Sequence, residues 1–383
     1  MDEAVETPAS TPLADIARLF LRLGLVSFGG PAAHVALMEE EIVRRRRWLT
    51  REAFLDLLGA ANLIPGPNST ELAIHIGFRR AGWPGLLVAG VCFILPAALI
   101  VTALAWGYVR YGALPAIAGI LAGVMPVVIA IVLQAIVSLA RGLARSRLVA
   151  IVGIAALVAT VLGVHELVVL LVAGGVTWTA SRPGRHAGDT RSLGVAPLAI
   201  PAVSFVVAAP ASFALGTLFL VFLKIGAVIF GSGYVLLAFL RADLVVRLGW
   251  LTERQLLDAI AAGQVTPGPV FTTATFIGYL LGGAAGATVA TIGIFLPAFV
   301  FVAASSALLQ RLRDSRGARA ALDGVNVASL ALMVVVTAQL ARTALTDAWG
   351  ILLAAASAVA LIRYRVGAMW LVLAGALLGA ALR

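Results

Sequence analysis

Apolar runs recur along the whole chain, separated by short polar or basic stretches. Three of the longest cover residues 85–108, 114–139 and 286–309. A helix needs about 20 consecutive apolar residues to cross the hydrocarbon core of a bilayer, and each of these runs reaches that length. The pattern therefore predicts an all-α polytopic membrane protein.

The second half of the sequence repeats the pattern of the first half. When the chain is shifted by 202 residues, WLT at 48–50 aligns with 250–252, and PGP at 65–67 aligns with 267–269. After a one-residue deletion the shift becomes 201, and LPA at 95–97 aligns with the same tripeptide of the second half. Matches over such a length indicate a tandem duplication.

Each half is expected to contain six hydrophobic segments. In the first repeat, residues 1–181, they lie at roughly 13–31, 53–78, 83–109, 114–140, 148–163 and 165–181. In the second repeat, residues 212–383, they lie at roughly 212–240, 255–281, 283–309, 320–341, 346–362 and 366–382. Residues 182–211 form a basic linker followed by an apolar run that is long enough to cross once, although it contains prolines.

If this linker crosses the membrane, the two halves are inverted relative to each other. The arginines of alternate loops then face the cytoplasm in both halves, as the positive-inside rule requires. The basic cluster at 44–47 is an exception. We expect inverted repeats.

Composition supports a membrane protein and excludes several functions. Of the 383 residues, 61% are hydrophobic and 12% are charged, against about 45–50% and about 25% in soluble proteins. The net charge of +10 comes from loop arginines that orient the chain and meet lipid, so we expect no nucleic-acid partner. The acidic start of the chain does not resemble a signal peptide, and the single cysteine excludes an intrachain disulfide.

Pro-Gly-Pro should break a helix at the same place in each half. Proline lacks the amide donor that continues a helix, yet it fits the first turn of a new one. The residues that follow would then present free amides and the positive end of a helix dipole, which is an anion-binding geometry. They are Asn68, Ser69, Thr70 and Glu71 in the first half, and Thr272 and Thr273 in the second. Transporters built from inverted repeats place such breaks around the substrate.

A second pair of breaks lies upstream, at FGGP (28–31) and FGSG (230–233), where small residues allow close approach of the backbone to a ligand. Arg22 and Lys224 each lie six residues before these phenylalanines and are repeat partners. A lone cation at membrane depth costs at least about 2.5–3.5 kcal/mol, which favours a functional role. The alternative is that both side chains extend to the interface.

Three further residues are candidates. Glu71 and His75 share a helix face and could carry a proton that is coupled to anion movement; alternatively the glutamate favours the helix start and the histidine is simply packed. His34 could donate to an oxyanion, or it could pack in the core or bond the backbone. Trp48 and Trp250 each precede a threonine that is expected to cap a helix, and they read as interface anchors.

The stretches that begin FGGPAAHV and FGSGYVLL, and run through the two Pro-Gly-Pro triplets, resemble the two halves of the chromate transporter family, long two-domain type. The resemblance covers about residues 13–382. It implies a carrier of the bacterial inner membrane that exports chromate, confers chromate resistance and meets sulfate as a competitor. The family's hallmark positions are Phe28, Gly29, Gly30, Pro31, Trp48, Pro65, Gly66, Pro67, Asn68, Ser69, Thr70 and Glu71, then Phe230, Gly231, Trp250, Pro267, Gly268 and Pro269. The second half departs from the first at Ser232, Gly233 and Val270, so the site is pseudosymmetric.

We therefore expect a secondary active exporter with one oxyanion site between the halves. Arg22, Lys224 and the hydroxyls of Ser69, Thr70, Thr272 and Thr273 would offset the charge of the dianion, together with the two helix N-termini. A sulfate or molybdate carrier and a passive anion channel stay as alternatives. No nucleotide-binding loop, metal cluster or catalytic triad occurs, so we expect neither an enzyme nor a cofactor. A homodimer is left open.

Overall fold

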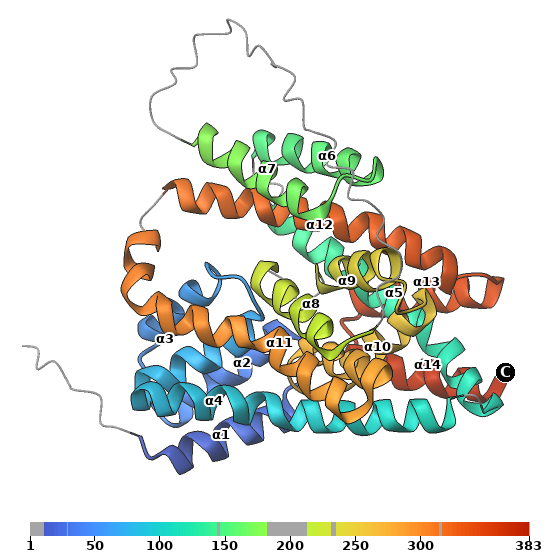
Figure 1. The fold of residues 1–383 in the computed structure, drawn as a ribbon, viewed down its shortest axis with the longest axis horizontal. Coiled ribbons are helices and arrows are strands. Elements are labelled where there is room, and N and C mark those ends of the chain that lie inside the picture. Colours follow the sequence, from blue (N-terminus) through green and yellow to red (C-terminus); the bar gives the residue numbers. More distant parts are fainter. Residues whose placement is uncertain are drawn as a thin grey trace, which may run out of the picture.

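The computed structural model describes residues 11–28, 30–112, 114–143, 146–181, 213–230, 235–313 and 316–382. Every regular element in these ranges is a helix (Figure 1). The first half contains α1 (Leu13–Val26), α2 (Pro31–Glu39), the π-helical η1 (Glu40–Arg45), α3 (Arg51–Ala61), α4 (Asn68–Tyr111), α5 (Pro115–Leu143), α6 (Arg147–Val161) and α7 (Glu166–Ala180).

The second half repeats this order. It contains α8 (Leu215–Val228), α9 (Leu236–Leu240), the π-helical η3 (Arg241–Arg247), α10 (Glu253–Val265), the 3₁₀ turn η4 (Val270–Thr272), α11 (Thr273–Arg313), α12 (Arg316–Ala344), α13 (Ala348–Arg363) and α14 (Ala368–Leu382). Even the two π-helical segments coincide under the shift. The connecting segment expected at 182–211 lies outside the described residues.

Two threonines start helices in equivalent places, as the sequence predicts. The Thr50 side chain accepts a hydrogen bond from the amide of Ala53 at the start of α3. Thr252 forms a reciprocal capping box with Gln255 at the start of α10. Each cap satisfies backbone donors that the helix itself leaves open.

α4 and α11 are helical hairpins rather than straight helices. The backbone leaves the helical conformation at Ala81–Gly82 in α4 and at Gly282–Gly283 in α11. A Cβ atom on Gly77 would lie only 2.3 Å from the carbonyl oxygen of Gly85, so the two arms cross in backbone contact. The turns fall where the sequence separates segments 53–78 and 83–109, and 255–281 and 283–309.

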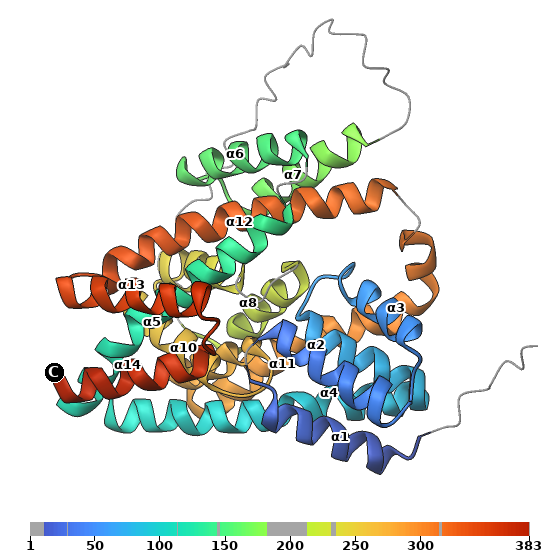
Figure 2. The ribbon, with the colours of Figure 1, turned by 180° about the vertical axis from the view of Figure 1, so that it is seen from behind.

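The last two helices of each half pack on the other half. α6 and α7 lie on α12, while α13 and α14 lie on α5. Figures 1 and 2 show α6 and α7 beside α12 from opposite sides. α4 also packs on α11, and α5 on α12. Because equivalent helices exchange partners in this way, neither half completes its core alone.

The helices fit a multi-pass membrane protein. Within the described residues, 68–111, 119–141, 270–304 and 317–344 are long and apolar enough to cross a bilayer. α6, α7, α13 and α14 are apolar but have only 15 or 16 residues, which is about 23 Å of helix against about 30 Å of hydrocarbon. They expose large apolar side chains such as Ile154, Leu171 and Leu377, which suits contact with lipid.

Candidate functional site

The two Pro-Gly-Pro triplets form the non-helical turns between α3 and α4 and between α10 and η4. Pro67 and Pro269 are extended and directly precede the next helical residue. Gly66 and Gly268 have φ values of 140° and 91°, a region that side chains with a Cβ atom rarely adopt. The sequence needs glycine between the prolines because the backbone reverses there.

These glycines tie the two halves together by equivalent hydrogen bonds. The Gly66 amide donates to the carbonyl of Ile229 at 2.7 Å, and the Gly268 amide donates to the carbonyl of Ser27 at 2.8 Å. Ser27 and Ile229 are themselves repeat partners, one residue past the ends of α1 and α8. Each turn therefore rests on the end of the first long helix of the opposite half, and the glycine amides are occupied by protein.

A small cavity lies where the two turns meet. Pro31, His34, Pro67, Asn68 and Ser69 line it from the first half, and Pro269, Val270 and Phe271 line it from the second. Its volume is ≈ 10 Å³, about the space that one water molecule needs. A tetrahedral oxyanion is larger, so this conformation is closed around the candidate site.

His34 makes two hydrogen bonds at the wall of this cavity. It is 1% exposed. Its Nδ1 lies 3.1 Å from Ser69 Oγ and its Nε2 lies 3.1 Å from the Ser27 carbonyl oxygen, while its ring meets the edge of Phe93. The Ser27 carbonyl thus accepts from both His34 and Gly268. His34 thereby connects the first turn of α4 with the Pro-Gly-Pro turn of the other half.

Glu71 and His75 lie further along α4 and are both buried. Neither carboxylate oxygen of Glu71 has a hydrogen-bond partner, nor does Nε2 of His75. A Cβ atom on Gly66 would lie 2.2 Å from Glu71 Oε1, so the carboxyl group sits against the Pro-Gly-Pro turn of its own half. Unsatisfied buried polar groups are rare in proteins and call for an explanation.

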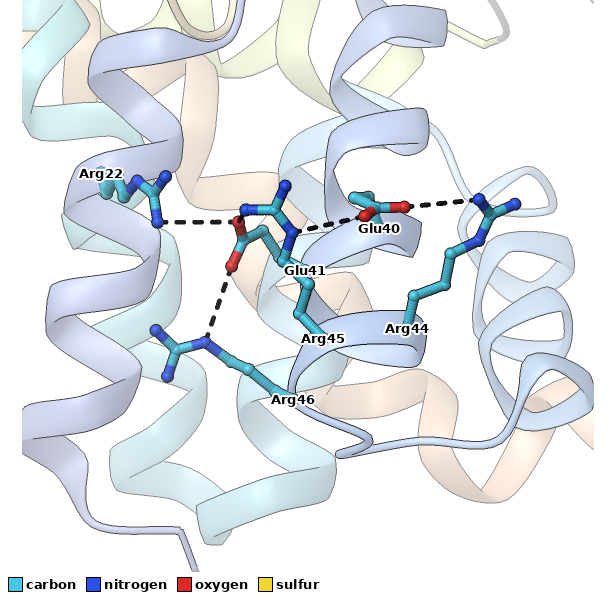
Figure 3. A network of polar contacts seen from close by, with 6 residues as sticks. All are labelled: Arg22, Glu40, Glu41, Arg44, Arg45 and Arg46. Atoms are coloured by element: carbon cyan, nitrogen blue, oxygen red, sulfur yellow. Dashed lines mark hydrogen bonds and ion pairs between the residues drawn. The ribbon is translucent and has the colours of Figure 1, made fainter.

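Arg22 and Lys224 lie elsewhere. Arg22 forms an ion pair with Glu41 at 3.6 Å, and Lys224 pairs with Asp243. Glu41 also binds Arg45, as Figure 3 shows. Neither cation lines the cavity, so the structure does not bring the two predicted cations to the turns.

The ion pairs repeat in the two halves. Glu41 and Asp243 are related by the 202-residue shift, and so are Arg45 and Arg247, which bind them at 3.0 and 2.9 Å. Both acids are nearly buried, with side chains 11% and 5% exposed. Sequence reasoning missed these acids, although the same shift that paired the cations places an acid at both positions.

The remaining predicted residues differ in their burial and in their hydrogen bonds. Thr272 and Thr273 donate their hydroxyls to the carbonyls of Pro269 and Val270, so neither hydroxyl is available to a ligand here. Thr70 is buried and its Oγ1 has no partner. Gly30 precedes α2 with φ 80°. Phe28 is exposed, and Phe230 is partly buried. Gly29, Gly231 and Ser232 lie outside the described residues.

Comparison with known proteins identifies the family. The model of a family described as chromate transporter matches residues 14–178 and again residues 216–380. A chromate transport protein of Cupriavidus metallidurans is 31% identical over 379 residues, which cover 98% of this chain and 94% of that protein. One of Pseudomonas aeruginosa is 32% identical over 351 residues, 89% of this chain and 83% of that protein.

A probable chromate transport protein of Synechococcus elongatus is 30% identical over 350 residues, which cover 90% of this chain and 89% of that protein. No solved structure matches the chain. The family model matches the chain twice, once in each half of the internal repeat, and together the two matches cover most of the sequence. The chain belongs to the chromate transporter family.

Proposed function

We propose that this protein is a secondary active exporter of chromate in the bacterial inner membrane, and that it binds the dianion between its halves. The observation that carries the proposal is the cavity lined by both Pro-Gly-Pro turns. The relatives named chromate transport proteins support the substrate. The proposal holds for a monomer and for a homodimer.

The chemistry of the cavity suits an oxyanion. Chromate accepts hydrogen bonds and donates none, so its site must supply donors. The first turn of α4 offers backbone amides and the positive end of a helix dipole, and Ser69 and Asn68 add side-chain donors beside them. Arg22 and Lys224 are engaged with carboxylates, and we assign them to holding α1 and α8 rather than to the ligand.

Transport requires the closed cavity to open to each side in turn. The bonds from Gly66 to Ile229 and from Gly268 to Ser27 hold it shut in this conformation. We propose that one of these two bonds breaks, together with the ion pairs beside it, when the site opens toward one face of the membrane, and that the other breaks when it opens toward the opposite face. An equivalent pair of contacts is what alternating access around a fixed site needs.

Inverted halves fit this scheme. A pseudo-twofold axis in the membrane plane would place the two turns at the same depth and aim their helices from opposite sides. The exchanged packing supports a twofold relation, and the distribution of basic loops favours inversion. The proposed topology has six segments in each half and one crossing at 182–211. The two helices on either side of a Pro-Gly-Pro turn count together as one segment.

Cysteine labelling tests the inversion. Thr50 and Thr252 are exposed repeat partners, so Thr50→Cys and Thr252→Cys, each in a Cys92→Ser background, change equivalent places by a similar small volume. We expect a membrane-impermeant thiol reagent to label them from opposite faces of intact cells. Labelling of both from the same face contradicts inverted repeats while leaving the transport proposal standing.

Transport into everted membrane vesicles tests the function. We expect chromate to accumulate when a proton gradient is imposed, and sulfate to compete. Ser69→Ala should reduce uptake strongly, whereas Ser329→Ala should not, because Ser329 is an equally buried serine of α12 without a partner. Downhill flux alone would indicate a passive channel. Accumulation of sulfate without chromate would indicate a different carrier, and in either case the proposal fails.

A further inference from the structure

We propose that His34 takes up the proton that accompanies oxyanion binding, and that its protonation turns the Ser69 hydroxyl from the histidine toward the oxyanion. The inference rests on the proposed function and adds a coupling residue to it. It is carried by the two hydrogen bonds of the His34 ring and by the place of both side chains in the cavity wall.

The hydrogen bonds fix the protonation pattern of the neutral ring. A backbone carbonyl only accepts, so the Nε2 that faces the Ser27 oxygen carries the hydrogen. In a neutral imidazole the other nitrogen is then an acceptor. Ser69 must therefore donate its hydroxyl hydrogen to Nδ1. In this state the Ser69 hydroxyl has no hydrogen left for a ligand.

A proton on Nδ1 reverses this bond. Both ring nitrogens then donate, and Ser69 Oγ accepts from Nδ1. The hydroxyl hydrogen has to point elsewhere, and Ser69 lines the cavity. An oxyanion there accepts it, and the imidazolium adds one positive charge beside the dianion. One N–H bond forms at Nδ1 with a proton taken from a solvent acid, which is left as its conjugate base; no bond between heavier atoms changes as the anion enters.

The surroundings of His34 leave it without a charged partner. It faces Ser27 from α1, Ser69 and Phe93 from α4, and Pro269 to Phe271 from the opposite half, none of which is charged.

The charged groups on these elements are engaged or point elsewhere. Arg22 of α1 is bound to Glu41, and Glu39 at the end of α2 is bound to Arg51. Neither carboxylate oxygen of Glu71 is bonded to the ring, and the second titratable group of this part of α4 is His75. Since no carboxylate of the described residues is bonded to the His34 ring, the oxyanion itself is the counterion that makes protonation favourable.

Chromate binding to the purified full-length protein tests the proposal. The measurement is the dissociation constant as a function of pH above neutrality, where chromate in solution is a dianion. If one proton is taken up with the anion, affinity falls about tenfold for each pH unit. We expect this slope for the wild type and a flat profile for His34→Gln. His165→Gln, a histidine at the start of α7 far along the chain, is the control and should keep the slope.

A second variant keeps the test decisive if His34→Gln folds poorly. Ser69→Ala should bind chromate more weakly than the wild type over the pH range in which the proton is taken up. The difference should close at higher pH, where the wild-type slope levels off, because the anion then meets a neutral histidine that holds the hydroxyl. A purely structural role of Ser69 predicts a difference that does not depend on pH, and that result overturns the inference.

Two other results also overturn it. One is an unchanged slope in His34→Gln. The other is a slope that His75→Gln or Glu71→Gln abolishes while His34→Gln does not. If the wild type binds no chromate at all, the proposed function falls first and the inference falls with it. The wild-type curve therefore separates the two failures.

Discussion

Gly268→Ala is the substitution that most directly tests how the two halves are joined. Gly268 has φ 91° and donates its amide to the Ser27 carbonyl of the other half at 2.8 Å. An added Cβ atom would lie 2.9 Å from Ala97 Cβ and 3.2 Å from the carbonyl oxygen of Gly24. Both obstacles are fixed to helix backbones, so the turn itself has to move.

The magnitude follows from two costs. A side chain with a Cβ atom at this φ value costs on the order of 1–3 kcal/mol, and overpacking against fixed neighbours costs about 1–3 kcal/mol more. The sum is about 2–6 kcal/mol, with part of the strain relieved by lengthening the bond to Ser27. Gly66→Ala is a less direct test of the turn, because its new Cβ atom would contact the Glu71 side chain, which can rotate away.

The assay combines stability with transport. Unfolding in mixed micelles gives the free-energy change, and chromate uptake into everted vesicles gives the activity. We expect a loss of at least about 2 kcal/mol and uptake reduced by about tenfold or more, since 1.4 kcal/mol already equals a factor of ten. Gly107→Ala is the control, because Gly107 lies in α4 with nothing near its missing Cβ, and it should retain both properties.

The outcome that refutes this reasoning is equally specific. If both Gly268→Ala and Gly107→Ala keep the unfolding free energy and the chromate uptake of the wild type, the turn is not held against α1 in the way described. If Gly268→Ala is destabilised but transports normally, the turn joins the halves without taking part in transport, and the proposed site loses its main structural support.

Three further substitutions separate packing from chemistry. Lys224→Met should destabilise the protein, because the nearly buried Asp243 carboxylate then keeps only Arg247 as its partner, and adding Asp243→Asn should recover part of the loss by removing the unbalanced charge. A cycle of unfolding free energies should give a coupling of about 1–3 kcal/mol, and a value near zero would contradict the pair. Tyr108→Phe removes the hydroxyl that donates to Asp258 of the other half at 2.8 Å, so we expect the free energy of unfolding to fall by about 1–3 kcal/mol. An unchanged free energy of unfolding would contradict this contact. Glu71→Gln keeps size but cannot exchange a proton, so we expect chromate to bind without gradient-driven accumulation, and normal accumulation would exclude Glu71 from coupling.

Much of the architecture was predictable from periodic patterns and repeats. The apolar runs predict helices, and the 202-residue shift predicts that each helix of one half has a partner in the other. Thr50 and Thr252 are recognisable as caps because a threonine followed by acidic and apolar residues is a local signal. The turns at Gly82 and Gly283 fall at boundaries that the interruption of apolar character already marks.

The packing between halves was not predictable in the same way. An apolar face shows that a helix is covered, but in a membrane protein it does not say by which neighbour, since lipid and protein are similarly apolar. The exchange that places α6 and α7 on α12 leaves no trace in hydropathy. The same holds for the bond from Gly268 to Ser27, which joins residues far apart in sequence.

The ion pairs of Arg22 and Lys224 were not predicted from the sequence, and this has a physical cause. The expectation from the sequence used the free-energy cost of an isolated cation at membrane depth, and it assumed that the anionic substrate was the partner of each cation. The actual partners, Glu41 and Asp243, lie on the next helical segment. They were visible under the repeat shift, but they belong to a stretch dense in charge, where the sequence does not single out one acid.

The two halves share a scaffold but not the chemistry of the candidate site. Under the repeat shift His34 corresponds to Leu236, Ser69 to Phe271 and Glu71 to Thr273. The reciprocal bonds from the two turns are equivalent. Among the described residues, however, the first half places the titratable His34 and Glu71 near its turn, whereas the hydroxyls of Thr272 and Thr273 beside the second turn already donate to backbone carbonyls. The second half contributes Pro269, Val270 and Phe271 as an apolar wall.

A symmetric scaffold with one-sided chemistry implies one anion and one set of protonatable groups per chain. A site built equally from both halves would allow two anions, one at each helix start. The equivalent place in the second half is a small cavity lined mainly by apolar residues such as Leu236, Leu237 and Val270. Its lining contains the polar side chains of Gln264 and Thr273 but no cation, so it offers a dianion little compensation for its lost hydration. Binding of one chromate per chain follows from this asymmetry, and a measured stoichiometry of two would mean that the second half binds through backbone donors alone.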